Sequence, residues 1–83
     1  MNKILFNPDG PRAVIPCIEM KQCPETLLRI CNIPNHSRVN VANGVNVSVI
    51  GESIFVRGVN SCFVPVQTES GNKYYVHERF VRE

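Results

Sequence analysis

The side chains of this chain that are capable of nucleophilic or metal chemistry are four cysteines and two histidines: Cys17, Cys23, Cys31, Cys62, His36 and His77. A catalytic cysteine needs a histidine within hydrogen-bond reach and surroundings that stabilise its thiolate. No catalytic signature surrounds any of the four. Zinc sites favour cysteines about two to four residues apart, whereas the gaps here are six, eight and thirty-one positions. We therefore predict a protein that is not an enzyme, with no metal or cofactor and with reduced, at least partly buried thiols.

A second group of residues has the composition of a binding surface. In a strand at Lys73–His77, Tyr75 and His77 share one face. A core needs only one face of such a strand, so we expect this face to be exposed next to an arginine. Exposed tyrosine and arginine are typical of protein-binding hot spots, and they can also stack on single-stranded bases. The predicted partner-binding residues are Phe55, Arg57, Tyr75, His77 and Arg79. The alternative is a tyrosine that plugs the end of a barrel with its hydroxyl in water.

The elements that position these residues are predicted to be strands. The clearest pattern is "RVNVANGVNVSVIGES", Arg38–Ser53, in which valine alternates with polar residues. Asn43-Gly44 is the preferred pair for a two-residue type I′ turn, in which both residues have positive φ. We therefore predict a central hairpin here, with these valines in the core: Val39, Val41, Val45, Val47 and Val49.

Other short apolar runs predict further strands at Lys3–Phe6, Arg12–Met20, Ser53–Val59, Cys62–Thr68 and Lys73–His77, and a last strand with Phe80 and Val81. Pro16 and Pro65 cannot donate to a ladder, so each is expected at an edge, a break or a bulge. Residues 24–31 fit a short helix or an irregular loop with a brief strand. The sum is an all-β fold, a small barrel of about five to seven short antiparallel strands with at most a short helix or 3-10 turn.

Size and charge restrict the organisation and the partners. The 83 residues form one domain, 1–83, and their net charge of +2 comes from well-mixed cations and anions. Nucleic-acid-binding proteins usually gather cations on one face or arm, so we rank nucleic acid below protein as a partner. The apolar run after Lys3 is shorter than the roughly 7–15 residues of a signal sequence. No stretch approaches the ~20 apolar residues of a membrane span. We therefore expect a cytoplasmic protein with no membrane partner.

Three segments between Leu28 and Val81 have the order of a known family. They are "LRICNIPNHSRV", "GVNVSVIGES" and "YYVHERFV". In this order the chain resembles the bacterial SH3-like domain, a small β-barrel. The resemblance implies an SH3-like barrel over 28–83, with 1–27 as an N-terminal extension or extra strands. It carries over no ligand-binding residue.

These observations together predict a non-enzymatic protein-binding module. Small barrels offer aromatic grooves and free strand edges to other proteins. By its size the chain is similar to small cytosolic accessory or inhibitor proteins of bacterial, phage or mobile-element origin, which act by occupying the surface of a partner protein. One alternative is a small-barrel nucleic-acid-binding protein. A second, implied by the family resemblance, is cell-wall binding by an exported SH3-like domain. The oligomeric state is left open.

Overall fold

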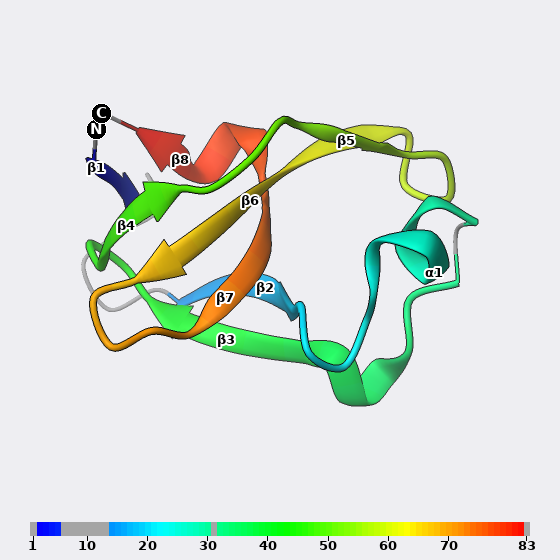
Figure 1. Cartoon of the computed structure of the whole chain (residues 1–83), viewed down its shortest axis with the longest axis horizontal. Helices are drawn as coiled ribbons and strands as arrows, with labels where there is room; N and C mark the ends of the chain where they lie inside the picture. The colour runs from blue at the N-terminus through cyan, green and yellow to red at the C-terminus, as the bar shows by residue number, and fades with distance from the viewer. Residues whose placement is uncertain (1, 6–13, 31, 83) are drawn as a thin grey trace.

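The computed structural model describes residues 2–5, 14–30 and 32–82 (Figure 1). Parts of the strands expected at Lys3–Phe6 and Arg12–Met20, and also Cys31, lie outside these ranges. Within them the chain forms β1 (Asn2–Leu5), β2 (Val14–Glu19), α1 (Glu25–Arg29), η1 (Asn35–Ser37), β3 (Arg38–Ala42), β4 (Asn46–Val49), β5 (Ile54–Val56), β6 (Ser61–Thr68), β7 (Lys73–His77), η2 (Glu78–Phe80) and β8 (Val81–Arg82), where η is a 3-10 helix. The all-β prediction is confirmed. Residues 24–31, for which the sequence allowed either a short helix or a loop with a brief strand, contain the helix α1.

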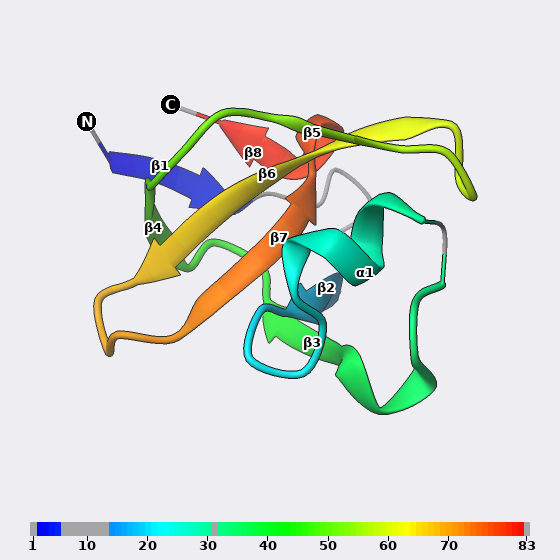
Figure 2. The same ribbon diagram turned by 45° about the vertical axis from the view of Figure 1, so that its right-hand side comes forward.

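The strands form one antiparallel sheet in the order β3-β2-β7-β6-β4-β1-β8, with β5 also paired to β6. Among the described residues, β3 pairs with β2 alone, and the two-residue β8 pairs with β1 alone. No ladder among the described residues joins these two ends of the order, so the sheet is not closed into a barrel and the prediction was wrong on closure. Because β8 pairs with β1, the first and last strands lie side by side, and Figures 1 and 2 both show α1 on the side away from them.

The predicted central hairpin was wrong. β3 pairs with β2, whereas β4 pairs with β1 and β6. Gly44 has a φ of +88°, but Asn43 does not have the positive φ that a type I′ turn needs. The reason is that Leu5 of β1 takes the hydrogen bonds of this turn: Gly44 N–H donates to Leu5 O at 2.7 Å, and Leu5 N–H donates to Val45 O at 2.9 Å. The alternation of valines therefore identified two strands correctly but paired them wrongly.

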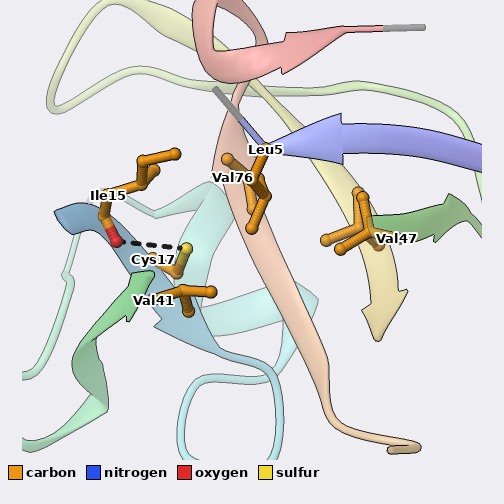
Figure 3. Packing of buried hydrophobic residues seen from close by; sticks show 7 residues of the cluster. Leu5, Ile15, Cys17, Val41, Val47 and Val76 are labelled. Atoms are coloured by element: carbon orange, nitrogen blue, oxygen red, sulfur yellow. Dashed lines mark hydrogen bonds between the residues drawn. The ribbon is translucent and has the colours of Figure 1, made fainter. Parts of the chain in front are cut away.

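One apolar cluster lies on one face of the sheet (Figure 3). Its buried members are Leu5, Ile15, Cys17, Val41, Val47, Val66 and Val76. Of the predicted core valines, Val41 and Val47 are buried and Val39 and Val45 pack partly against the cluster. Val49 is exposed, which corrects the prediction for that position.

A second apolar cluster lies on the opposite face of the central strands. Its buried members are Ile18, Cys23, Leu28, Ile54, Val56, Phe63 and Tyr75. Alternate residues of one strand therefore serve different clusters, as Val76 and Tyr75 of β7 do. This second cluster is why the face expected to be exposed on β7 is covered.

Helix α1 covers this second cluster with a single buried residue, Leu28. The helix has only five residues, too few to be stable by itself. Its exposed ion pair, Arg29 Nε to Glu25 Oε2 at 3.0 Å, contributes only about 0.3–0.5 kcal/mol. The burial of Leu28 against the sheet is therefore the main force that holds α1.

Both strand prolines lie where one side of the strand has no ladder partner. Pro16 pairs with β3, while the β2–β7 ladder begins only at Cys17. Pro65 pairs with β7, but on its other side the β5 partners end at Phe63 and the β4 partners begin at Val66. The missing N–H of each proline is therefore tolerated inside an otherwise paired strand, which refines the prediction of an edge or a break.

The chain kinks between β4 and β5 opposite Pro65. Ile50 N–H donates to Pro65 O at 3.0 Å, so the proline carbonyl is still paired. A Cβ on Gly51 would lie 3.2 Å from Pro65 Cγ, so the lack of a side chain lets the kink approach the ring. The kink allows β4 and β5 to share one side of β6.

We predict that Leu28→Ala lowers the free energy of unfolding by about 2–5 kcal/mol, because it leaves a cavity under α1. Ile30 is the matched control, since it follows α1 directly and is 69% exposed. Ile30→Ala should change stability by less than about 0.5 kcal/mol. Urea unfolding of both variants measures the difference. Equal losses would show that α1 is not held by the burial of Leu28.

Candidate functional site

An apolar groove of about 240 Å³ lies where β2, β6 and the end of β7 meet the loops. Its lining consists of Pro16, Cys17, Ile18, Ile33, Arg38, Val59, Phe63, His77 and Phe80. Ile18 and Phe63 are buried and form part of the floor, while Ile33 and Phe80 are half-buried and Val59 is exposed. The groove therefore presents apolar side chains that another molecule can cover.

The tip of the β5–β6 hairpin positions Val59 at the groove. The tip is closed by Asn60, which has a φ of 51° and whose N–H donates to Arg57 O at 3.2 Å. Asparagine is one of the few residues that adopt this left-handed conformation readily. Val59 O also accepts a hydrogen bond from Ser61 Oγ at 3.1 Å. The turn thus holds the backbone of an exposed valine in place.

His77 connects the groove to the 3-10 helix η2. Its Nδ1 accepts a hydrogen bond from Arg79 N–H at 3.1 Å, which caps the start of η2. The ring packs edge-on against Phe63, with centroids 5.4 Å apart, and against Phe80 at 6.1 Å. Because Nδ1 is an acceptor, the neutral ring carries its proton on Nε2. His77 therefore packs against both aromatic rings of the groove while its own ring is held by the Arg79 N–H.

The charges at the groove are cationic. Arg38 lines it and is exposed, and the Arg79 guanidinium lies 5.3 Å from the Phe80 ring centroid. No described residue in the lining carries a carboxylate. Within the described ranges, neither arginine forms a salt bridge. Arg38 in the lining and Arg79 beside Phe80 therefore carry positive charges that no carboxylate of the described residues pairs with.

Of the five predicted partner-binding residues, only His77 lines the groove, and Arg79 lies beside it, next to the Phe80 ring. Tyr75 is 4% exposed in the second cluster, and burial, followed by the Glu25 carboxylate, raises the pKa of its hydroxyl. Its predicted exposure was therefore wrong, because a core covers both faces of β7.

The other two predicted residues, Phe55 and Arg57, are exposed but do not line the groove. Phe55 pairs with Cys62 and lies between Ile54 and Val56 in β5. Because side chains alternate along a strand, Phe55 points to the opposite face of the sheet from these two neighbours. The five residues therefore do not form one continuous surface.

Two of the three cysteines within the described ranges have buried thiols. Cys17 and Cys23 are buried and Cys62 is half-buried, and all three are free. Cys17 Sγ donates to Ile15 O at 3.5 Å (Figure 3), and burial raises the pKa of Cys17 to about 12. Burial also raises the pKa of Cys23. These two thiols are therefore poor nucleophiles.

Other features of the described residues do not form a chemical site. No group of three or more His, Cys, Asp or Glu side chains there is placed to hold a metal ion. In the same ranges, no helix has the length and apolar character needed to cross a membrane. A second hollow of about 310 Å³ lies at the opposite end of β7, and its lining is Glu19, Met20, Lys21, Gly71, Asn72, Lys73 and Tyr74. Its charges are mixed and it lies between turns, so it offers less apolar surface than the groove.

The residues that sequence reasoning missed are those that reach the groove from separate elements: Ile33, Arg38, Val59, Phe63 and Phe80. Each occupies an ordinary position for a loop or strand residue. The sequence held one signal for this set, because the aromatic residue Phe80 lies only three positions after His77. The pairing of β6 with β7 then places Phe63 opposite His77, so the three rings lie next to one another.

Comparisons of the chain with protein-family models, with curated proteins and with solved structures gave no match. No relative therefore supplies a ligand or a functional residue for the groove. What the groove binds is inferred from its own side chains and charges.

We predict that the stability of the protein falls as the pH rises from about 9 towards 12. The folded state keeps the Cys17 proton up to about pH 12, whereas the unfolded thiol loses it near its ordinary pKa of 9.0. The loss from this thiol at pH 10 is about 1.4 kcal/mol relative to pH 7. In Cys17→Ala this part of the pH dependence is absent, although the variant is less stable at pH 7. Urea unfolding of both proteins at pH 7 and 10, under reducing conditions, gives the slopes, and identical slopes would refute the assignment.

We predict that His77→Ala releases the N–H of Arg79 and lowers stability by about 0.5–2 kcal/mol, the usual cost of a lost cap. His77→Asn is the matched variant, because asparagine also offers a capping acceptor. Amide hydrogen exchange at Arg79 should be faster in the alanine variant than in the asparagine variant. Equal protection in both variants and the parent would mean that the ring does not cap η2.

Proposed function

We propose that this chain is a non-enzymatic protein-binding module that acts by occupying the surface of a partner protein. The observation that carries the proposal is the groove, in which half-buried and exposed apolar side chains surround a buried floor. Burying one such side chain contributes about 1.5–3 kcal/mol. Aromatic and arginine side chains at such a site are the usual composition of protein-binding hot spots.

The size of the groove supports a protein segment over a small molecule. Its volume of about 240 Å³ is below the range of about 300–1,000 Å³ that is common for small-molecule sites. It accommodates one or two side chains of a partner. The backbone of that partner would lie outside, against the exposed Val59 and Arg38.

The fold that we propose for this module is a relative of the SH3-like domain with an open sheet. Such small β-folds bind peptides at grooves between loops and at strand edges. Here the proposed surface is the loop groove at the end of β7. An accessory or inhibitor role belongs to the same proposal, because a small fold whose described residues form no catalytic site would act by covering the surface of a partner.

The test compares capture of partner proteins by three immobilised forms of the chain in a lysate of its source organism: the parent, Val59→Asp and Ile50→Asp. Val59 and Ile50 are 46% and 41% exposed, and only Val59 lines the groove. The aspartate in Val59→Asp should abolish capture, because its carboxylate would be buried without a partner when the groove is covered, and burying an unpaired charge is costly. The Ile50 variant should capture as the parent does.

The proposal fails if all three forms capture the same proteins, or if none captures any. Circular dichroism shows whether both variants fold. A salt-sensitive mobility shift of single-stranded RNA or DNA by the parent, with no captured protein, would favour a nucleic-acid-binding role instead.

A further inference from the structure

We propose, on the basis of that proposed function, that the segment captured by the groove carries an apolar anchor next to acidic side chains. The anchor would enter the groove and contact its apolar floor and walls. The acidic side chains would bind the arginines Arg38 and Arg79 next to it. This names the chemistry of the partner, which the binding function alone does not.

The apolar requirement comes from the floor. Ile18 and Phe63 are buried there, and Phe80 forms a wall whose ring packs against His77. The Nδ1 of His77 is already used by Arg79 N–H. The His77 ring is therefore held in place by this hydrogen bond, and it packs edge-on against Phe63 and Phe80. Restraint of this kind lowers the ordering cost when an apolar side chain enters.

The acidic requirement comes from Arg38 and Arg79. Both are exposed, and within the described part of the chain neither is neutralised by a carboxylate. Arginine binds carboxylates through two parallel hydrogen bonds, which adds geometric selectivity. Stacking of Arg79 near Phe80 orients its guanidinium while its edge stays available for hydrogen bonds.

One carboxylate acts against this preference. Glu78 is exposed in η2, beside Arg79, although it does not line the groove. It reduces the local positive potential near its sequence neighbour Arg79 more than near Arg38, which begins β3, a strand that pairs with β2 and not with β7. Arg38 is therefore the residue on which the preference depends most, and a basic segment would be repelled there.

The experiment uses two short fluorescein-labelled peptides, each with a central Leu-Phe pair. Glutamates flank the pair in one peptide and lysines in the other. Fluorescence anisotropy at low salt and pH 7 should show that the glutamate peptide binds about tenfold or more tightly than the lysine peptide. Its affinity should fall as sodium chloride is added.

Arg38→Glu should weaken the glutamate peptide by about three- to tenfold and should strengthen the lysine peptide. Lys73→Glu is the matched control, since it makes the same change of net charge at the opposite end of β7. It should change both affinities by less than about twofold.

Equal affinities for the two peptides, no binding of either, or equal effects of Arg38→Glu and Lys73→Glu would overturn the inference. These outcomes are separate from failure of the proposed function, which the capture experiment with Val59→Asp decides. If capture depends on Val59 but the peptides show no charge preference, the binding function stands and its acidic partner does not.

Discussion

The structure depends on burial of both faces of its central strands β2, β7 and β6. Neighbouring side chains in a strand point to opposite faces, so a strand covered twice must place apolar residues at consecutive positions. Cys17 and Ile18 do so in β2, and Tyr75 and Val76 do so in β7. A chain of this size gains a second small core in this way, since the first cluster alone has limited area. Helix α1 and the β5–β6 hairpin are the elements that cover the second face.

The same arrangement generates the groove. Because Pro65 leaves a gap in the ladder, β6 pairs with β4 along one part and with β5 along another. The β5–β6 hairpin continues past the point where β7 ends, and its tip brings Val59 to the groove. Two members of the second cluster, Ile18 and Phe63, line this surface from below. Apolar side chains and two arginines are left there without a covering element among the described residues.

Most strands were predictable because each one depends on local signals. The hairpin between β6 and β7 follows from its turn, where Gly71 has a φ of +95°. The connection between β3 and β4 carries an equally strong turn signal, yet the strands separate because Leu5 bonds to the turn backbone. No residue near Asn43 in the sequence indicates that Leu5, almost forty positions away, will bind the backbone of this turn. Pairing between distant strands is a global property, so local turn chemistry predicts it only where neighbours in sequence are also neighbours in the sheet.

The sequence by itself determined an all-β chain, the positions of most of its strands and the burial of Cys17 and Cys23. Local periodicity, turn residues and the missing catalytic spacings are enough for these, since each depends on residues close together in the chain. Only the tertiary structure decided that Tyr75 is core and that Phe55 faces away from the groove. It also decided that Arg38, Val59 and Phe80 share one surface. The physical reason is that exposure depends on what packs over a strand from elsewhere in the chain, and alternation along the strand shows only that its two faces differ.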